Sequence, residues 1–404
     1  MFEILYRRTA DVVRHRAAPF AEERERYLRH CAEQGVTWGR LRTNAKWMRW
    51  AAVRMSANDC RGVNSARLHE LVRCAGLTPE SAESYEQSIR PWWKFMGWWH
   101  EESKPVPFGL QLEQFISWMR DERGLSATTV DGRRRRIAGF LQWCADTRRD
   151  LAALLPEDLD AYFISSATQR WSRVSVASMA TGLRVFLRHA ARSGACRKGL
   201  AESIVSPTIY KLASLPYALS WEDVQRLLAS ASSDTPRDVR DRAILMLLAI
   251  YGWRSCEVAA LRLDQIDWAG HQLHVWRSKC RQSQVYPLQA SVAEALARYI
   301  DTVRPAVTHP EVFIHLQAPR RPISPQAIYH VVSQRLRALD IQAAHLGPHA
   351  LRHSCATKLL ADGLTLKEIG DHLGHHSTSA TMIYTKVDLG SLREVGNFDL
   401  GGLQ

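Results

Sequence analysis

Cysteine pairs, a signal peptide and long apolar runs are all missing from this sequence. Its eight cysteines among 404 residues are scattered singly, and none belongs to a Cys-x-x-Cys pair. Single cysteines in a chain of this length are typical of reduced side chains in the cytosol. No apolar run reaches the about 20 residues that a membrane-spanning helix needs, and the first residues lack the apolar segment of a signal peptide. We therefore expect a cytoplasmic protein that is not bound to a membrane.

Patterns that bind metal ions are also scarce, since the sequence has no paired carboxylates of the kind that hold a catalytic cation. His349 and His353 lie four residues apart, and three more histidines follow at His372, His375 and His376. A zinc protease would have Glu directly after the first histidine, whereas here Ala, Leu and Arg separate the pair. A cation beside Arg352 would also be repelled. We expect no metal ion and no cofactor.

Positive charge, in contrast, is abundant. Lysine and arginine number 54 against 41 acidic residues, which gives a formal net charge of +13. With 46% hydrophobic and 24% charged residues, the chain has the composition of an ordinary globular protein that is long enough for two or three domains. A basic balance spread along a chain favours a polyanionic partner, of which nucleic acid is the commonest.

The pattern of helices and breaks divides the chain into three segments. Residues 1–104 form a helical extension whose many tryptophans have the spacing of core residues, and it ends at the linker Lys104–Pro107. Residues 105–207 contain four or five compact helices. Residues 216–404 form an α-rich unit with one β-hairpin at 272–288. We therefore expect a mainly α fold with a small β element in the C-terminal domain.

Four consecutive arginines lie in one helix of the middle segment: Arg133, Arg134, Arg135 and Arg136. Four neighbouring side chains cannot all face a core, so most of them either meet solvent or bind phosphate. The sequence leaves both interpretations open, and we treat the four as candidate DNA-binding residues.

The most informative stretch runs from Gly347 to Val387. Pro348 suits the first position of a helix, because its missing N–H costs nothing there. In this helix His349, Arg352 and His353 share one face. A helix start with a basic face binds anions well, since its unpaired N–H groups and its dipole both favour negative charge.

A second, short helix follows within the same stretch. Thr365 and Glu368 make a capping box at its start, and Gly374 ends it. His375 then falls in the turn, and Tyr384 lies nine positions further on, inside or at the edge of a third helix.

Three further candidates lie upstream in the same segment. Arg254 follows the stop of a buried helix, Glu257 lies in the first turn of the next helix, and Lys279 lies in the turn of the hairpin. These residue types suit cleavage of a phosphodiester without a metal ion. Arginine can bind two non-bridging oxygens with one planar fork, histidine and lysine can transfer protons, and tyrosine can attack phosphorus and hold a covalent intermediate.

The order of these motifs resembles that of the tyrosine recombinases, the phage-integrase family of site-specific DNA recombinases. The resemblance covers about residues 108–395 and is strongest in three places. These are Tyr-Gly-Trp-Arg-Ser-Cys-Glu-Val-Ala-Ala-Leu-Arg-Leu from Tyr251, Pro-His-Ala-Leu-Arg-His from Pro348, and Leu-Gly-His with Ile-Tyr-Thr-Lys-Val at 373–387. Several motifs in the right order make this a specific signal.

The resemblance implies roles for the phosphate-binding residues. Arg254 and Arg352 would grip the scissile phosphate, and His375 would add a hydrogen bond to it. Glu257 occupies the acidic position that orients the site. Tyr384 would become joined to the 3′ phosphate, so that cleavage and rejoining proceed through a 3′-phosphotyrosyl intermediate.

The resemblance also implies roles in proton transfer, where Lys279 would protonate the departing 5′ oxygen and His349 would assist around the tyrosine. The hairpin reads Arg277-Ser-Lys-Cys-Arg281, without the glycines that usually flank the lysine, so Arg277 and Arg281 compete with it for this position. Counting back from Tyr286 selects Lys279.

The architecture and partners implied by the resemblance are those of a DNA integrase from a mobile element, with a role in integration or transposition. The helices of 105–207 would form a core-binding domain that closes with the catalytic domain of 216–404 around double-stranded DNA. The tail after Tyr384 would dock on a neighbouring protomer, giving a homo- or hetero-tetramer on two DNA sites. Residues 1–104 lie outside the shared motifs, as an arm-type DNA-binding or assembly module.

Two other functions remain open from the sequence. Residues 366–384 alone resemble a helix-turn-helix, which would make the chain a DNA-binding protein without catalysis, but this interpretation leaves Arg254 and Lys279 without a role. A type IB topoisomerase-like activity would share the chemistry and differ in relaxing DNA without site preference.

Overall fold

The computed structural model describes residues 1–56, 58–100, 107–167, 171–209, 217–277, 282–343, 345–375 and 381–387. Contacts divide the chain into two compact units, Glu101–Ala213 and a second unit made of Met1–His100 with Ser214–Gln404. Buried apolar residues form a separate core in each of the segments 2–93, 112–204 and 219–351, with a small fourth cluster at 355–384. Among the helices of the described part, none has the length and apolar character to cross a bilayer.

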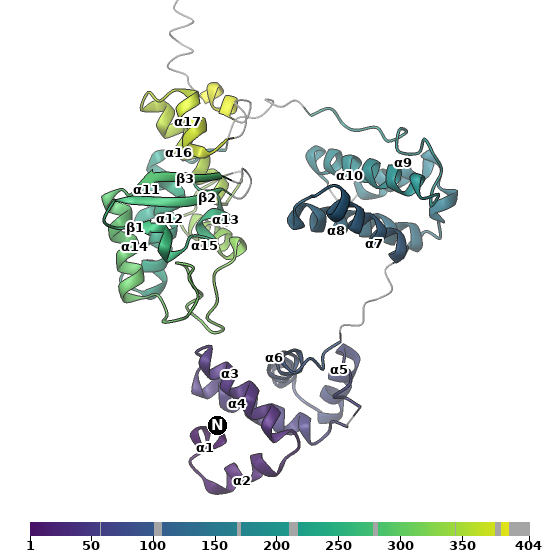
Figure 1. Cartoon of the computed structure of the whole chain (residues 1–404), viewed down its shortest axis with the longest axis vertical. Helices are drawn as coiled ribbons and strands as arrows, with labels where there is room; N and C mark the ends of the chain where they lie inside the picture. Colours follow the sequence, from purple (N-terminus) through teal and green to yellow (C-terminus); the bar gives the residue numbers. More distant parts are fainter. Residues whose placement is uncertain are drawn as a thin grey trace, which may run out of the picture. The chain divides into compact units, whose positions relative to one another are not determined.

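The first segment is a set of helices (Figure 1). The helices of the whole segment are α1 (Phe2–Leu5), α2 (Thr9–Ala17), α3 (Ala21–Glu33), α4 (Trp38–Ala52), α5 (Ser65–Ala75) and α6 (Pro79–Phe95). Of these, α4, α5 and α6 each begin after a threonine or asparagine cap. Thr37, Asn64 and Thr78 each accept a hydrogen bond from a backbone N–H of the helix that follows.

Tryptophans supply much of the core of this first segment, and Trp92 and Trp93 are completely buried. One tryptophan that the spacing assigned to the core lies instead on the surface, since Trp38 is 52% exposed. It occupies the first position of α4, directly after the cap, where neighbouring helices do not cover its side chain.

The middle unit is entirely helical among its described residues, which agrees with the four or five helices expected there. Its apolar core is built around Phe115, Ile137, Phe140 and Leu183, contributed by three different helices. The elements are α7 (Gly109–Ser117), the π-helix η1 (Trp118–Glu122), α8 (Ala127–Asp146), the 3₁₀ turn η2 (Leu151–Ala153), α9 (Pro156–Ala167) and α10 (Arg173–Arg192).

The C-terminal segment surrounds a buried helix, α12, with helices and one small sheet (Figure 1). The helices are α11 (Trp221–Ala229), α12 (Pro236–Ile250), α13 (Ser255–Ala259), α14 (Ala290–Thr302), α15 (Pro325–Ala338), α16 (Pro348–Ala361) and α17 (Leu366–Leu373), with 3₁₀ turns η3 (Leu263–Gln265) and η4 (Met382–Val387). The mainly α class expected from the sequence is thereby confirmed.

The sheet of this segment is antiparallel in the order β1-β2-β3, with β1 (Ile266–Asp267), β2 (Gln272–Arg277) and β3 (Gln282–Pro287). The hairpin expected at 272–288 is confirmed. The sheet also contains the strand β1, which has only two residues and was too short to be predicted from an alternating pattern. Because side chains alternate along a strand, Leu273, Val275 and Arg277 all point to the buried face of β2.

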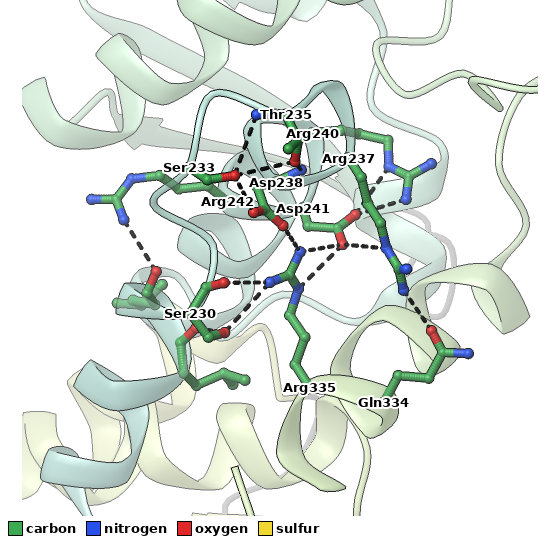
Figure 2. Close-up of polar contacts among 12 residues, drawn as sticks. Ser230, Ser233, Thr235, Arg237, Asp238, Arg240, Asp241, Arg242, Gln334 and Arg335 are labelled. Atoms are coloured by element: carbon green, nitrogen blue, oxygen red, sulfur yellow. Dashed lines mark hydrogen bonds and ion pairs between the residues drawn. The ribbon is translucent and has the colours of Figure 1, made fainter. Parts of the chain in front are cut away.

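A network of ion pairs joins α12 to α15 on one side of this segment (Figure 2). Asp241 is completely buried and receives hydrogen bonds from Arg240 at 2.7 Å and from Arg335 at 2.7 Å. Arg335 also reaches Asp238 and the backbone carbonyl of Ser230. A buried carboxylate is stable only with such partners, so the network fixes the position of α15 against α12.

Candidate active site

Arg254 is positioned by the sharp turn that ends α12. Gly252 has a φ of +60°, and a Cβ at this residue would lie 2.7 Å from Leu373, so the turn requires glycine for both its conformation and its close packing. Arg254 is then the N-cap of α13, and its Nη1 donates to Glu257 Oε1 at 2.9 Å. The other oxygen of Glu257 accepts from the backbone N–H of Arg254 at 2.8 Å, which holds the arginine at two points.

Arg352 joins two turns of the chain from its place on α16. Its side chain is only 2% exposed, and its two Nη atoms donate to the carbonyls of Gly252 and Leu373, each at 2.6 Å. Burial, together with the charges of Arg254 and Arg277, lowers the pKa of Arg352 to about 10. It therefore remains a cation at neutral pH, and its carbonyl contacts bring the turn before Arg254 next to the end of α17.

His375 lies directly after Gly374, whose φ of +63° ends α17. Its Nδ1 is 2.8 Å from the buried hydroxyl of Thr381. Burial lowers the pKa of His375 to about 4, and the nearby positive charges of Arg352 and Arg254 add to the effect. The imidazole is therefore neutral at pH 7. If the threonine hydroxyl donates to Nδ1, the proton resides on Nε2, which leaves Nε2 as a hydrogen-bond donor.

Tyr384 lies in η4 with its side chain buried, and its Oη is 2.9 Å from Nδ1 of His353. Burial raises the pKa of Tyr384 to about 12, against the attraction of Arg352. Burial likewise lowers the pKa of His353 to about 4, with further lowering from His349 and Arg352. The phenol is therefore protonated and its histidine partner neutral at pH 7.

His349 lies on the same face of α16 as His353, and their rings are 4.6 Å apart. The structure thus places Arg254 in direct contact with Glu257, and Arg352 in contact with the two turns that precede Arg254 and His375. It brings His349 and Tyr384 to the adjoining His353. Lys279 lies outside the described residues, between the end of β2 and the start of β3.

Sequence reasoning missed two contacts of this site. His353 shares a helix face with His349, but only the folded chain places it against Tyr384 Oη. Thr381 had no distinguishing pattern at all, because its bond to His375 depends on how the chain returns after α17. The spacing of His353 was the one signal that could have selected it.

Arg277, which competed with Lys279 in the sequence, is 1% exposed and points into the domain. It donates to Glu257 Oε2 at 2.7 Å and to the carbonyl of His372 at 3.0 Å. A guanidinium enclosed in this way cannot reach a bound DNA backbone, so the structure removes Arg277 from the candidates for proton donation. Arg281 lies outside the described residues.

The four arginines of α8 lie in the other compact unit and are described separately. Arg135 is paired with Asp131 at 3.0 Å and Arg134 with Glu113 at 3.7 Å, both at exposed positions. Exposed pairs of this kind contribute little to stability and can exchange partners. Arg133 is half-buried, and Arg134, Arg135 and Arg136 are exposed.

No group of three or more His, Cys, Asp or Glu side chains in the described ranges is arranged to hold a metal ion. The histidines at 349, 353, 372 and 375 have other neighbours: the rings of His349 and His353 meet edge to face, His372 faces Tyr286, and His375 contacts Thr381. The seven cysteines that the structure describes are all free.

The low pKa values of His353 and His375 predict a loss of stability in acid. In the unfolded chain both imidazoles have a pKa near 6.5, so between pH 6.5 and pH 4 the folded state binds fewer protons than the unfolded state. The free energy of unfolding is therefore at its full value above pH 6.5 and decreases as the pH falls toward 4. Allowing for their partial exposure, we expect opening of α16 and α17 to become easier by about 2 kcal/mol over that range. Amide hydrogen exchange, corrected for intrinsic rates, measures this. A double variant, His353→Gln with His375→Gln, should lose most of the change of opening free energy with pH. An unchanged pH dependence would contradict the assignment of the acid effect to these two histidines.

Comparison with known proteins gives a consistent result. The model of the phage integrase family matches residues 218–390, and the model of the phage integrase N-terminal SAM-like domain matches residues 112–194. A putative integrase/recombinase, y4rA of Sinorhizobium fredii (strain NBRC 101917 / NGR234), is 36% identical over 294 residues, which cover 72% of this chain and 71% of that protein.

Two solved structures share the fold at low sequence identity. The XerH site-specific recombinase bound to difH substrate, in a pre-cleavage complex, is 19% identical with a TM-score of 0.54, covering 72% of this chain and 84% of that one. The Tn1549 transposon integrase in complex with circular intermediate DNA is 16% identical with a TM-score of 0.51, covering 71% of this chain and 99% of that one.

Proposed function

We propose, from the premise that this chain belongs to the phage integrase family of site-specific tyrosine recombinases, that Tyr384 cleaves one strand of duplex DNA and remains joined to its 3′ phosphate. The observation that carries the proposal is the placement of Arg352. Its guanidinium donates to the carbonyls of Gly252 and Leu373, which lie two residues before Arg254 and His375. His353, the next residue of α16, contacts Tyr384 Oη.

The phosphate-binding part of the proposal rests on charge and donor geometry. Arg254 and Arg352 would neutralise the two non-bridging oxygens, and neutral His375 would donate from Nε2. Glu257 fixes Arg254 through its side chain and its backbone N–H, so the arginine is oriented before a phosphate arrives. Positioned donors of this type stabilise the charge that grows on phosphorus-bound oxygens in the transition state.

The chemical step follows from this arrangement. Tyr384 Oη forms a bond to phosphorus while the bond from phosphorus to the 5′ oxygen breaks. The phenolic proton passes to the neighbouring imidazoles, with His353 in contact and His349 beside it. Lys279 would supply a proton to the departing 5′ oxygen. In the reverse direction a 5′ hydroxyl attacks the phosphotyrosine, so the strand is rejoined without an external energy source.

We also propose how the rest of the chain serves this reaction. The unit matched by the SAM-like model would bind duplex DNA together with the C-terminal segment, with Arg133–Arg136 among its phosphate contacts. Four protomers would assemble on two duplexes, and the element that encodes the chain would be mobile. The similarity to y4rA and to the Tn1549 integrase fold supports this context.

The test is a covalent adduct on a nicked DNA substrate that lets the cleaved fragment diffuse away. The full chain should form a protein–DNA band that resists SDS, in EDTA as well as in magnesium, and protease digestion should leave the label on a peptide that contains residue 384. Binding to DNA without any adduct would favour a catalytically silent DNA-binding protein instead. Relaxation of plasmids without site preference would point to a topoisomerase.

A further inference from the structure

Arg277, the last residue of β2, is a buried cation that the proposed reaction does not use. Its side chain is 1% exposed, and a guanidinium in such a place is stable only where its donors meet acceptors. Nε donates to Gln284 at 3.0 Å, Nη1 to Glu257 at 2.7 Å, and Nη2 to the His372 carbonyl at 3.0 Å. Nη2 also donates to the hydroxyl of Tyr286.

These acceptors belong to three different pieces of the chain. Glu257 is on α13, Gln284 and Tyr286 are on β3, and His372 is in the last turn of α17. Arg277, a residue of the hairpin, is therefore a side chain that joins β3, α13 and the end of α17. The hydroxyl of Tyr286 reinforces the connection, because it in turn donates to the carbonyl of His372.

Two of these pieces, α13 and the end of α17, adjoin residues of the proposed reaction. Glu257 uses one carboxylate oxygen for Arg277 and the other for the side chain of Arg254, so the two arginines share one anion. At the end of α17, a Cβ on Gly374 would lie 2.9 Å from Nε of Arg277. The guanidinium thus packs against the residue that immediately precedes His375.

We propose that Arg277 is a positioning residue for strand cleavage, which orients Arg254 through Glu257 and sets the distance between Arg254 and the turn that carries His375. This inference rests on the proposed function. Arg277 does not touch DNA in this role, since its side chain is enclosed by the protein. Its removal should therefore slow the chemical step and leave DNA affinity nearly unchanged.

The experiment uses the full chain, at saturating concentration, on the nicked DNA substrate. It measures the single-turnover rate of adduct formation, the fraction of folded protein and the Kd for the same DNA. Arg277→Met is expected to lower the rate per folded complex by about 100-fold, the loss that small misplacements of catalytic groups produce. Its Kd should change by less than about threefold, since no DNA phosphate contact is lost.

A double-mutant cycle separates positioning from general weakening of the fold. If Arg277 acts through Glu257, combining Arg277→Met with Glu257→Gln should give a rate within about threefold of the slower single variant. Independent losses would multiply, and that result would overturn the proposal. Arg277→Lys, which retains a buried cation, takes the place of Arg277→Met in the cycle if the latter does not fold.

The matched control is Arg335→Met. Arg335 is another largely buried arginine of the same segment that binds carboxylates, but it joins α15 to α12 (Figure 2). The control variant should lower stability and leave the rate per folded complex unchanged. Arg304→Met can replace it, since Arg304 is another arginine of this segment and its Nη2 donates to the carbonyls of His309 and Glu311. Equal rates per folded complex for the Arg277 variant, this control and the wild type would also overturn the proposal. A wild-type chain that forms no adduct would instead count against the proposed function itself.

Discussion

Tyr384→Phe is expected to abolish the covalent protein–DNA adduct completely. The substitution removes the oxygen that would bond to phosphorus, and the phenyl ring that remains has no nucleophilic atom. Loss of a nucleophile that forms a covalent intermediate removes the reaction path and does not merely slow it. Labelled nicked DNA, incubated with the variant and resolved under denaturing conditions, measures the outcome.

The variant should otherwise resemble the wild type. Removing the hydroxyl leaves Nδ1 of His353 without its partner, which costs about 1 kcal/mol of stability. The ring of Tyr384 and its packing against Cys355 and Ile369 are retained. DNA affinity should stay within about twofold, since Tyr384 is not one of the cationic phosphate ligands.

Tyr299→Phe provides the matched control for this experiment. Tyr299 is also completely buried in the C-terminal segment, and its hydroxyl accepts a hydrogen bond from the Ile314 backbone at 3.1 Å. This variant should lose comparable stability and still form the adduct. An adduct that persists in Tyr384→Phe would assign the nucleophile to another residue and end the proposed mechanism.

The largest effect on stability is expected from Asp241→Asn. The carboxylate is completely buried and receives hydrogen bonds from Arg240 at 2.7 Å and Arg335 at 2.7 Å, with Arg237 at 3.7 Å (Figure 2). Asparagine keeps the shape but removes the negative charge, so Arg240 loses this carboxylate partner and Arg335 keeps only Asp238. Breaking a buried ion pair at one partner costs about 3–5 kcal/mol.

Hydrogen exchange of the full chain measures this loss locally, which avoids treating a multidomain protein as a two-state system. Protection of the amides in α12 and α15 should fall by about 10²–10⁴-fold, the equivalent of that free energy. Asp264→Asn is the control, because Asp264 forms an ion pair with Arg262 at an exposed position. Wild-type protection in Asp241→Asn would show that the network is dispensable.

Local features of the fold were predictable from the sequence because their causes lie within a few residues. Pro348 at the start of α16, the Thr365–Glu368 capping box and the αL glycine at Gly374 each define a helix end by local hydrogen bonds and dihedral angles. The hairpin followed from its alternating residues. Spacing along α16 likewise placed His349 and Arg352 on adjoining positions of one helix.

Features that depend on distant segments could not be predicted in this way. Asp241 meets Arg335 across 94 residues, and Arg277 meets His372 across 95 residues. Neither pair has a spacing rule, since only the packing of α15 and α17 decides which side chains meet. The sequence identified Arg277 as a basic residue near the hairpin turn, and burial alone assigns it to the interior.

The anchoring of Arg352 has a consequence for how a phosphate is captured. Two of the five N–H groups of its guanidinium are committed to the carbonyls of Gly252 and Leu373, which leaves the planar fork in one orientation. This long side chain therefore loses its rotamer entropy when the protein folds and not when DNA binds. Lysine, with its flexible stem and point charge, could not reproduce such preorganisation at this position.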